Sequence, residues 1–345
     1  MLRKQNFMAK TFEDDFEPLY RIPPEELRPT ARQWLKHGLL FFLTLITSTM
    51  AGLLPPLGSG VALPDIPDPT NLVEWLLIIP QVFAVMLTAV VSQVWANPAL
   101  LLNGLAFSLS VLTILTFHEF GHYIACRLYG VKATLPYFIP FPFLSPAGTL
   151  GAVIRMQSPM PTRKAIFDIG VAGPLAGFVA IIPIAILGLA TMQTAPPGEA
   201  AGLTFADPLL TRLLGAMIGV DPTHGVINPF YAAAWIGILV TSLNLLPVSQ
   251  LDGGHAVYAV LGERIHFWTG RVAFVAMVIL TVIGWEYYNT PGTLIFTILL
   301  ALLLRLPHPE PLVDEPLDGK RKLVAILTII VFVLSFMPFP IQISQ

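Results

Sequence analysis

The sequence contains few charged residues and almost no cysteine. Only 12% of its 345 residues are Asp, Glu, Lys or Arg, against about 25% in typical soluble proteins. The single cysteine, Cys126, excludes an internal disulfide and any metal site built from several cysteines. A net charge of −2 offers no sign of nucleic-acid binding, so no nucleic-acid partner is expected. We expect no secretory signal, because a long polar leader precedes the first apolar run near Leu39.

Long apolar runs take the place of charge. Hydrophobic residues make up 55% of the chain, and several runs reach the roughly 20 residues needed to cross a bilayer. The sequence therefore predicts an all-α polytopic transmembrane helical bundle, with a polar cytosolic tail at 1–36 and one transmembrane domain at 37–345. Helices are expected at about 38–54, 72–95, 99–128, 165–191 and 230–246.

Two stretches do not fit this helical pattern. Residues 137–146 are rich in aromatics and proline, and residues 148–156 alternate as a short strand flanked by glycines. We expect a membrane-associated β or re-entrant segment near 137–156, since such backbone is tolerated at membrane depth only where protein or water covers it. Residues 193–228 are expected to form a loop, too short for a separate domain of ordinary size.

One motif carries most of the functional signal. Residues 118–122 read His-Glu-Phe-Gly-His at the end of an uncharged apolar run. Histidines four positions apart on a helix share a face, so His118 and His122 can reach one metal ion. Glu119 lies close enough to act on a water at that metal, as in zinc peptidases. Ionisable groups in a membrane helix are costly and usually mark a function, although a histidine pair at a helix end facing lipid headgroups is the plainer alternative.

A second stretch, 244–255, offers a third ligand. Pro247 removes a backbone hydrogen bond and Gly253-Gly254 permits a break, so the helix is expected to unwind and to present Asp252 on irregular backbone. Taken alone, Asp252 would more simply cap a helix. Because His118 and His122 offer two imidazoles to a metal and lack a third ligand, we instead favour Asp252 as that ligand. His255 is left open as a partner of the site, a helix-start residue or a solvent-facing group.

Together these residues resemble the site-2 protease family of intramembrane zinc metalloproteases, over a core of about 105–257. The resemblance implies zinc bound by His118, His122 and Asp252, with Glu119 as catalytic base. The family pattern Asn-x-x-Pro-x-x-x-Leu-Asp-Gly is matched from Asn244 to Gly253. It implies a substrate or oxyanion role for Asn244. The stretch from Gly148 to Met156, and the segment 167–174 after it, look like the branch without a PDZ domain found in cyanobacteria and plastids.

The predicted function is cleavage of peptide bonds within or near the transmembrane helices of membrane-protein substrates, with a water on zinc as nucleophile. We expect a substrate to unwind and pair with the strand that contains Gly148 and Gly151. A non-proteolytic adaptor or metal-dependent transporter is the alternative, although no internal repeat typical of transporters is evident. We expect a multi-pass integral membrane protein of a prokaryotic plasma membrane, with a thylakoid or plastid-type membrane as the other possibility. The sequence does not indicate an oligomeric state.

Basic residues predict the orientation in the membrane. They cluster at the N-terminus and at 127–164, 263–271 and 305–322, whereas 55–73 has none. The positive-inside rule puts those clusters in the cytosol. An even number of crossings must then separate the N-terminus from residue 132. Because 38–54 and 99–128 already supply two crossings, residues 72–95 are expected to be re-entrant or to lie along the outer interface. The alternative is that 72–95 spans the membrane and the N-terminus lies outside.

Overall fold

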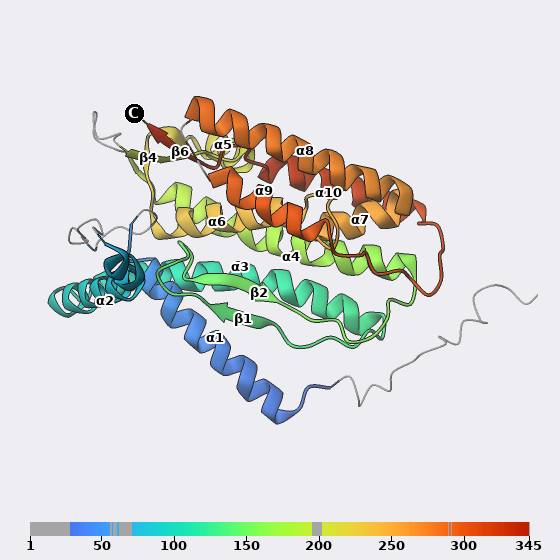
Figure 1. Cartoon of the computed structure of the whole chain (residues 1–345), viewed down its shortest axis with the longest axis horizontal. Coiled ribbons are helices and arrows are strands. Elements are labelled where there is room, and N and C mark those ends of the chain that lie inside the picture. The colour runs from blue at the N-terminus through green and yellow to red at the C-terminus, as the bar shows by residue number, and fades with distance from the viewer. Residues whose placement is uncertain are drawn as a thin grey trace, which may run out of the picture.

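The computed structural model describes residues 28–55, 57, 61, 71–194, 202–288, 290 and 292–344; most of the predicted tail, 1–27, lies outside them. Helices dominate these residues (Figure 1), which confirms the predicted helical membrane fold. Four helices are long and apolar enough to cross a membrane, at Ile78–Ala96, Leu100–Leu128, Arg163–Ala190 and Glu263–Tyr288. The helices are α1 (Ala31–Ala51), α2 (Leu72–Ala96), α3 (Leu100–Leu128), α4 (Arg163–Ala190), α5 (Leu209–Ile218), α6 (Pro229–Asn244), α7 (Asp252–Leu261), α8 (Glu263–Tyr288), α9 (Gly292–Leu303) and α10 (Gly319–Ser335).

The strands are short and form three antiparallel pairs. β1 (Tyr137–Pro140) pairs with β2 (Thr149–Val153), β3 (Gln193–Thr194) with β5 (Gly225–Val226), and β4 (Gly202–Phe205) with β6 (Ile341–Ser344). The last pair joins the C-terminal strand to the segment that follows α4. These strands form three separate two-stranded sheets rather than one sheet domain (Figure 1).

The centre of the protein is formed by α3, α4 and α6, which lie side by side (Figure 1). Ile181 and Ile238 are fully buried between them, with Ile114 almost so. Small residues permit this close packing, because a Cβ on Gly121 of α3 would lie only 2.4 Å from the backbone oxygen of Ala172 in α4. Helix contacts in lipid depend on such small residues, since burial from water does not drive them.

The β1–β2 hairpin packs between α1 and α3 (Figure 1). His37 Nδ1 lies 2.9 Å from the backbone oxygen of Pro136, and the rings of Phe41 and Phe138 meet edge to face. The expected non-helical segment near 137–156 is present, and β2 occupies the middle of the strand predicted at 148–156. The partner strand β1 was not predicted, because its aromatic and proline residues do not alternate.

Two predictions of local structure are wrong. α1 begins at Ala31 rather than near Gly38, because Thr30 and Gln33 form a reciprocal capping box at its start. The segment 193–228 contains the helix α5 and is not only a loop. α5 has an amphipathic face whose residue Leu210 is buried against the core, so its helical conformation depends on tertiary packing.

Ion pairs collect the basic residues of distant segments at one end of the bundle. Arg163 Nη1 lies 3.1 Å from Asp314 Oδ1, and Lys164 Nζ lies 2.6 Å from Glu315 Oε2. Arg321 at the start of α10 binds Asp168 of α4 with an Nη2–Oδ2 distance of 2.6 Å. These contacts place the basic starts of α4 and α10 beside each other, and the cytosolic orientation of this end stays a prediction.

The helix α2 lies at the opposite end, beyond the point where α1 ends and α3 begins (Figure 1). Its residues Ala89 and Val90 are buried against Leu53 and Leu54, and the Phe83 ring contacts Phe143 at 5.1 Å between centroids. This position is compatible with the interfacial placement expected for 72–95, which stays a prediction.

The orientation can be tested with single cysteines in a Cys126→Ser background. Arg32→Cys and Lys322→Cys should both react with an impermeant maleimide from the cytosolic side, because both side chains are exposed at the basic end. Asp221→Cys, exposed in the loop before α6, should react only from the other side. Labelling of Arg32→Cys and Lys322→Cys from opposite sides would contradict the predicted topology.

Candidate metal centre

Three side chains from two helices converge inside the bundle. His118 and His122 project from the same face of α3 with their Nε2 atoms 3.2 Å apart. Asp252, from the start of α7, brings Oδ2 within 3.3 Å of His118 Nε2 and 3.4 Å of His122 Nε2. Four ligands around zinc at about 2.0–2.1 Å are separated by about 3.3 Å at tetrahedral angles. The three atoms thus have the spacing of three corners of a zinc tetrahedron, and the group is the one candidate metal cluster among the described residues.

A backbone contact orients one of the imidazoles. His122 Nδ1 lies 2.7 Å from the carbonyl oxygen of Ile169 in α4. A carbonyl can only accept, so Nδ1 carries the proton and a neutral ring presents the lone pair of Nε2 toward His118 and Asp252. Metal-binding histidines usually have such an outer partner, which fixes the ring and its tautomer.

Glycines of α4 make room for the two histidines. A Cβ on Gly173 would lie 2.0 Å from His122 Nε2, and a Cβ on Gly177 would lie 3.2 Å from His118 Cβ. Gly170 is as tight against α7, where its Cβ would meet His255 Cβ at 2.8 Å. Small residues at 172–177 also let α4 approach α3 closely. Gly173 also supplies the space that the His122 ring occupies.

The segment between α6 and α7 differs from the expected break. The irregular backbone covers 245–251, where Ser249 adopts a left-handed φ of +48°, and Asp252 is the first residue of α7. Gly253 and Gly254 lie inside the first turn of that helix rather than in the break. They are required because a Cβ would come within 2.0 Å of Leu245 O and 2.3 Å of Ser249 O. Asp252 does not cap α7: Leu251 is the N-cap residue and no side chain bonds there.

His255 does not join the three ligand atoms. Its Nδ1 lies 2.9 Å from Nε2 of His308, in the loop after α9. Burial lowers the pKa of His308 to about 3, with the neighbouring His255 and His266 adding to the effect. A neutral His308 donates from Nδ1 to Pro309 O and accepts from His255. His255 therefore links the Asp252 helix to this loop, a contact that sequence spacing could not reveal.

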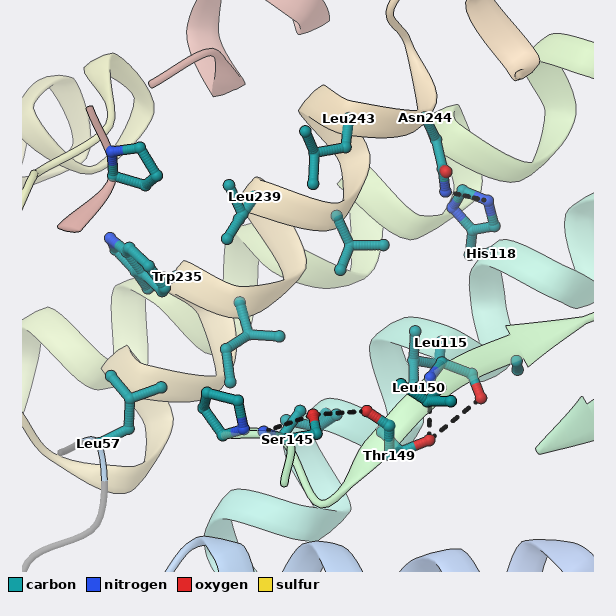
Figure 2. Close-up of a pocket in the computed structure, with 18 of the residues that line it drawn as sticks. Leu57, Leu115, His118, Ser145, Thr149, Leu150, Trp235, Leu239, Leu243 and Asn244 are labelled. Carbon is teal, nitrogen blue, oxygen red and sulfur yellow. Dashed lines mark hydrogen bonds between the residues drawn. The ribbon is translucent and has the colours of Figure 1, made fainter. Parts of the chain in front are cut away.

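A cavity of about 510 Å³ opens beside the histidines, and Figure 2 shows it bounded by α3, β2 and α6. His118, Glu119 and Asn244 line its inner end, and Asn244 Nδ2 lies 3.4 Å from His118 Nε2. The remaining wall is largely apolar, with Trp235, Leu239 and Leu243 of α6 facing Leu115 and Leu150 across it. Glu119 is 6% exposed. The cavity therefore joins one buried carboxylate and one amide to an apolar channel.

The two glycines predicted to meet a substrate have different surroundings. Gly151 lies in the cavity wall with a φ of +99°, and a Cβ there would meet no atom within 4 Å. Gly148 has a φ of +68° and packs against α1, where a Cβ would lie 2.3 Å from Thr47 O. Gly148 therefore shapes the turn before β2 and does not line the cavity.

Comparison with known proteins identifies relatives. A model of peptidase family M50 matches residues 106–284, just over half of the chain. The chain is 30% identical over 247 residues to a probable zinc metalloprotease EGY1, chloroplastic, of Oryza sativa subsp. japonica (68% of this chain and 41% of that protein). It is 32% identical over 245 residues to the protein of the same name from Arabidopsis thaliana (68% and 43%). A probable zinc metalloprotease EGY2, chloroplastic, of Oryza sativa subsp. indica is 29% identical over 262 residues (72% and 46%).

The chain thus spans less than half the length of these relatives. No solved structure gives a significant match.

The glycine beneath His122 gives a direct test of the centre. Gly173→Ala should strongly reduce the zinc content of the purified protein, because its Cβ would occupy the position of the imidazole. Gly38→Ala is the matched control, since a Cβ there meets nothing within 4 Å and alanine favours a helix by about 1 kcal/mol. Equal zinc in both variants, measured by elemental analysis, would show that His122 does not bind the metal in this position.

Proposed function

The chain belongs to peptidase family M50, and on that premise we propose that it is a zinc-dependent intramembrane protease that hydrolyses peptide bonds of transmembrane substrates. The observation that carries the proposal is the placement of Glu119 and the three-atom cluster at the buried end of a cavity within the helical bundle. Two imidazoles and one carboxylate, with a fourth position open, are the ligand set of a catalytic zinc site.

Each ligand has a defined role in this proposal. His118, His122 and Asp252 hold the ion, with the Ile169 carbonyl orienting His122. Zinc, when bound, supplies the Lewis acidity that lowers the pKa of a water and stabilises the developing oxyanion. The donor set fits that ion because its nitrogen and oxygen atoms already have tetrahedral spacing.

Proton transfer falls to Glu119. Its carboxylate, one residue after His118, lines the cavity where a substrate carbonyl would enter. It takes the proton of the attacking water and returns it to the leaving amine. Asn244 lines the same inner end, and its amide donates toward the oxygen of the substrate carbonyl.

The strand β2 offers the substrate a docking edge. One edge of β2 pairs with β1, while its residues 149–153 all line the cavity that leads to Glu119. A substrate helix that unwinds locally can add a strand there and satisfy its backbone hydrogen bonds, which is essential in lipid. Leu150 is 61% exposed on this strand, opposite Leu239 and Leu243, where apolar substrate side chains can pack (Figure 2).

The membrane domain is proposed to cover 37–345, with its catalytic core at about 105–257 and the polar tail at 1–36. The word chloroplastic in the names of the relatives gives no support to the prokaryotic plasma membrane expected from sequence. It supports the thylakoid or plastid-type membrane as the location.

Catalysis and metal binding should separate in two variants. Glu119→Gln should keep its zinc yet lose about 10²–10⁴-fold in proteolysis, because an amide cannot take the proton. Loss of a residue that only hydrogen-bonds a metal ligand typically weakens metal binding about 10–100-fold. Asp252→Ala should weaken zinc binding by more than that, because it removes a ligand itself. The readouts are zinc content and cleavage of a panel of co-expressed single-span membrane proteins.

His255→Ala is the control for Asp252→Ala and should bind zinc much better, since His255 contacts His308 and not the ligand group. Full proteolysis by Glu119→Gln would show that the cleavage does not depend on the Glu119 carboxylate and would contradict its role as the base. Wild-type zinc in Asp252→Ala with loss in His255→Ala would mean that the third ligand is His255.

The docking edge can be tested by disulfide crosslinking in a Glu119→Gln, Cys126→Ser background. Leu150→Cys should crosslink to a cysteine near the cleavage site of a bound substrate. Val179→Cys, equally exposed at 62% but outside the cavity lining, should not. Similar yields from both positions would indicate random encounter in the membrane rather than docking on β2.

A further inference from the structure

A second groove, of about 650 Å³, opens between α8 and α10. Its floor is formed by Leu246 and Pro247, in the segment that leads from Asn244 to Asp252. The walls include Trp268 of α8, Phe332 of α10 and Phe336, the residue just after α10. Its surface is almost entirely apolar, and Arg264 is the one charged residue among those that line it.

The groove is long enough to hold a lipid tail, and it runs along a helix that is long enough to cross a membrane. From Arg264 to Leu280 the lining follows α8 for about 24 Å, at 1.5 Å per residue. One leaflet contributes about half of the 30 Å hydrocarbon core of a bilayer. The groove therefore starts at the basic end of the bundle and extends past the depth of one leaflet.

Arg264 is available to bind a partner at the polar end. Its side chain is exposed, and within the described part of the chain it forms no hydrogen bond or ion pair. Arg271, two turns further on, is engaged with its own helix: Nη1 donates to Phe267 O at 2.9 Å and the guanidinium covers the Phe267 ring. The first turn of α8 adds the positive end of a helix dipole beside Arg264.

The aromatic neighbour of Arg264 indicates the depth of this end. Trp268, one turn along α8, is 60% exposed and lines the groove. Tryptophan is enriched where headgroups meet hydrocarbon, so Arg264 lies at headgroup level. Glu263, the acidic residue at the start of α8, is not among the lining residues, so the groove itself offers no carboxylate to a choline or ethanolamine group.

We propose that the groove binds a membrane phospholipid with an anionic headgroup, its phosphate against Arg264 and one acyl chain between α8 and α10. Charge complementarity selects the headgroup, because the groove presents a cation without a matching anion. The bound chain covers Leu246 and Pro247, whose neighbours carry Asn244 and Asp252. The lipid thereby supports the irregular segment that delivers Asp252 to the metal centre.

The test is native mass spectrometry of the purified full-length chain with phosphatidylglycerol or phosphatidylcholine added in detergent. The wild type should retain about fivefold more phosphatidylglycerol, since one basic residue at an anionic surface contributes about 1 kcal/mol. Arg264→Gln should lose this preference and Arg264→Lys should keep most of it. Arg305→Gln removes an exposed charge at the same end of the bundle, outside the groove, and should leave the preference unchanged.

A second pair of variants tests the acyl-chain path. Ala276→Phe fills the groove and should reduce retention of phosphatidylglycerol, whereas Val275→Phe, on the exposed face of α8 outside the lining, should not. Equal retention of the two lipids by the wild type, or equal losses in Arg264→Gln and Arg305→Gln, would overturn the proposal in favour of unspecific annular lipid. If the wild type forms dimers and Ala276→Phe dissociates them, the groove is instead an interface between copies of the chain.

Discussion

The close approach of α4 to the histidine face of α3 is the contact on which the rest of the structure depends. Without a side chain at Gly173, α4 comes near enough for the Ile169 carbonyl to bond His122 and for the ring to lie over the helix. The same approach at Gly170 seats α7, which carries Asp252. A single glycine-lined helix surface thus fixes three side chains that would otherwise be independent, at a depth where an unpaired polar group is costly.

Asp252 needs further support, because the segment before it is not helical. Ser249 Oγ donates to Leu306 O and Gln250 Nε2 to Pro307 O, at 3.1 and 2.7 Å, while His255 bonds His308. These partners all lie in the loop between α9 and α10, beyond the residues matched by the family model. The same loop is tied to α4 by ion pairs at Arg163 and Lys164. The loop between α9 and α10 therefore supports the segment that carries Asp252 into the candidate metal centre.

The hairpin shows how irregular backbone is satisfied within the bundle. Thr149 Oγ1 donates to Ile139 O at 2.8 Å and accepts from Gly151 N at 3.0 Å, while Ser48 of α1 donates to Ala147 O. Polar side chains thus supply the bonds that water would provide elsewhere. In the proposed function, the edge that faces the cavity receives the substrate, whose extended backbone gains hydrogen bonds there.

By itself the sequence determined the class of fold, the motif helix and the identities of His118, Glu119, His122 and Asp252 as candidates, because helical periodicity and ligand spacing are local properties. The capping box of Thr30 and Gln33 is also a local signal, and it marks the start of α1. Only the tertiary structure decided that Asp252 starts a helix, that Gly148 faces α1 and that His308 bonds His255. The contacts of Gly148 with Thr47 and of His255 with His308 join residues more than 50 positions apart, and no local pattern encodes such a contact.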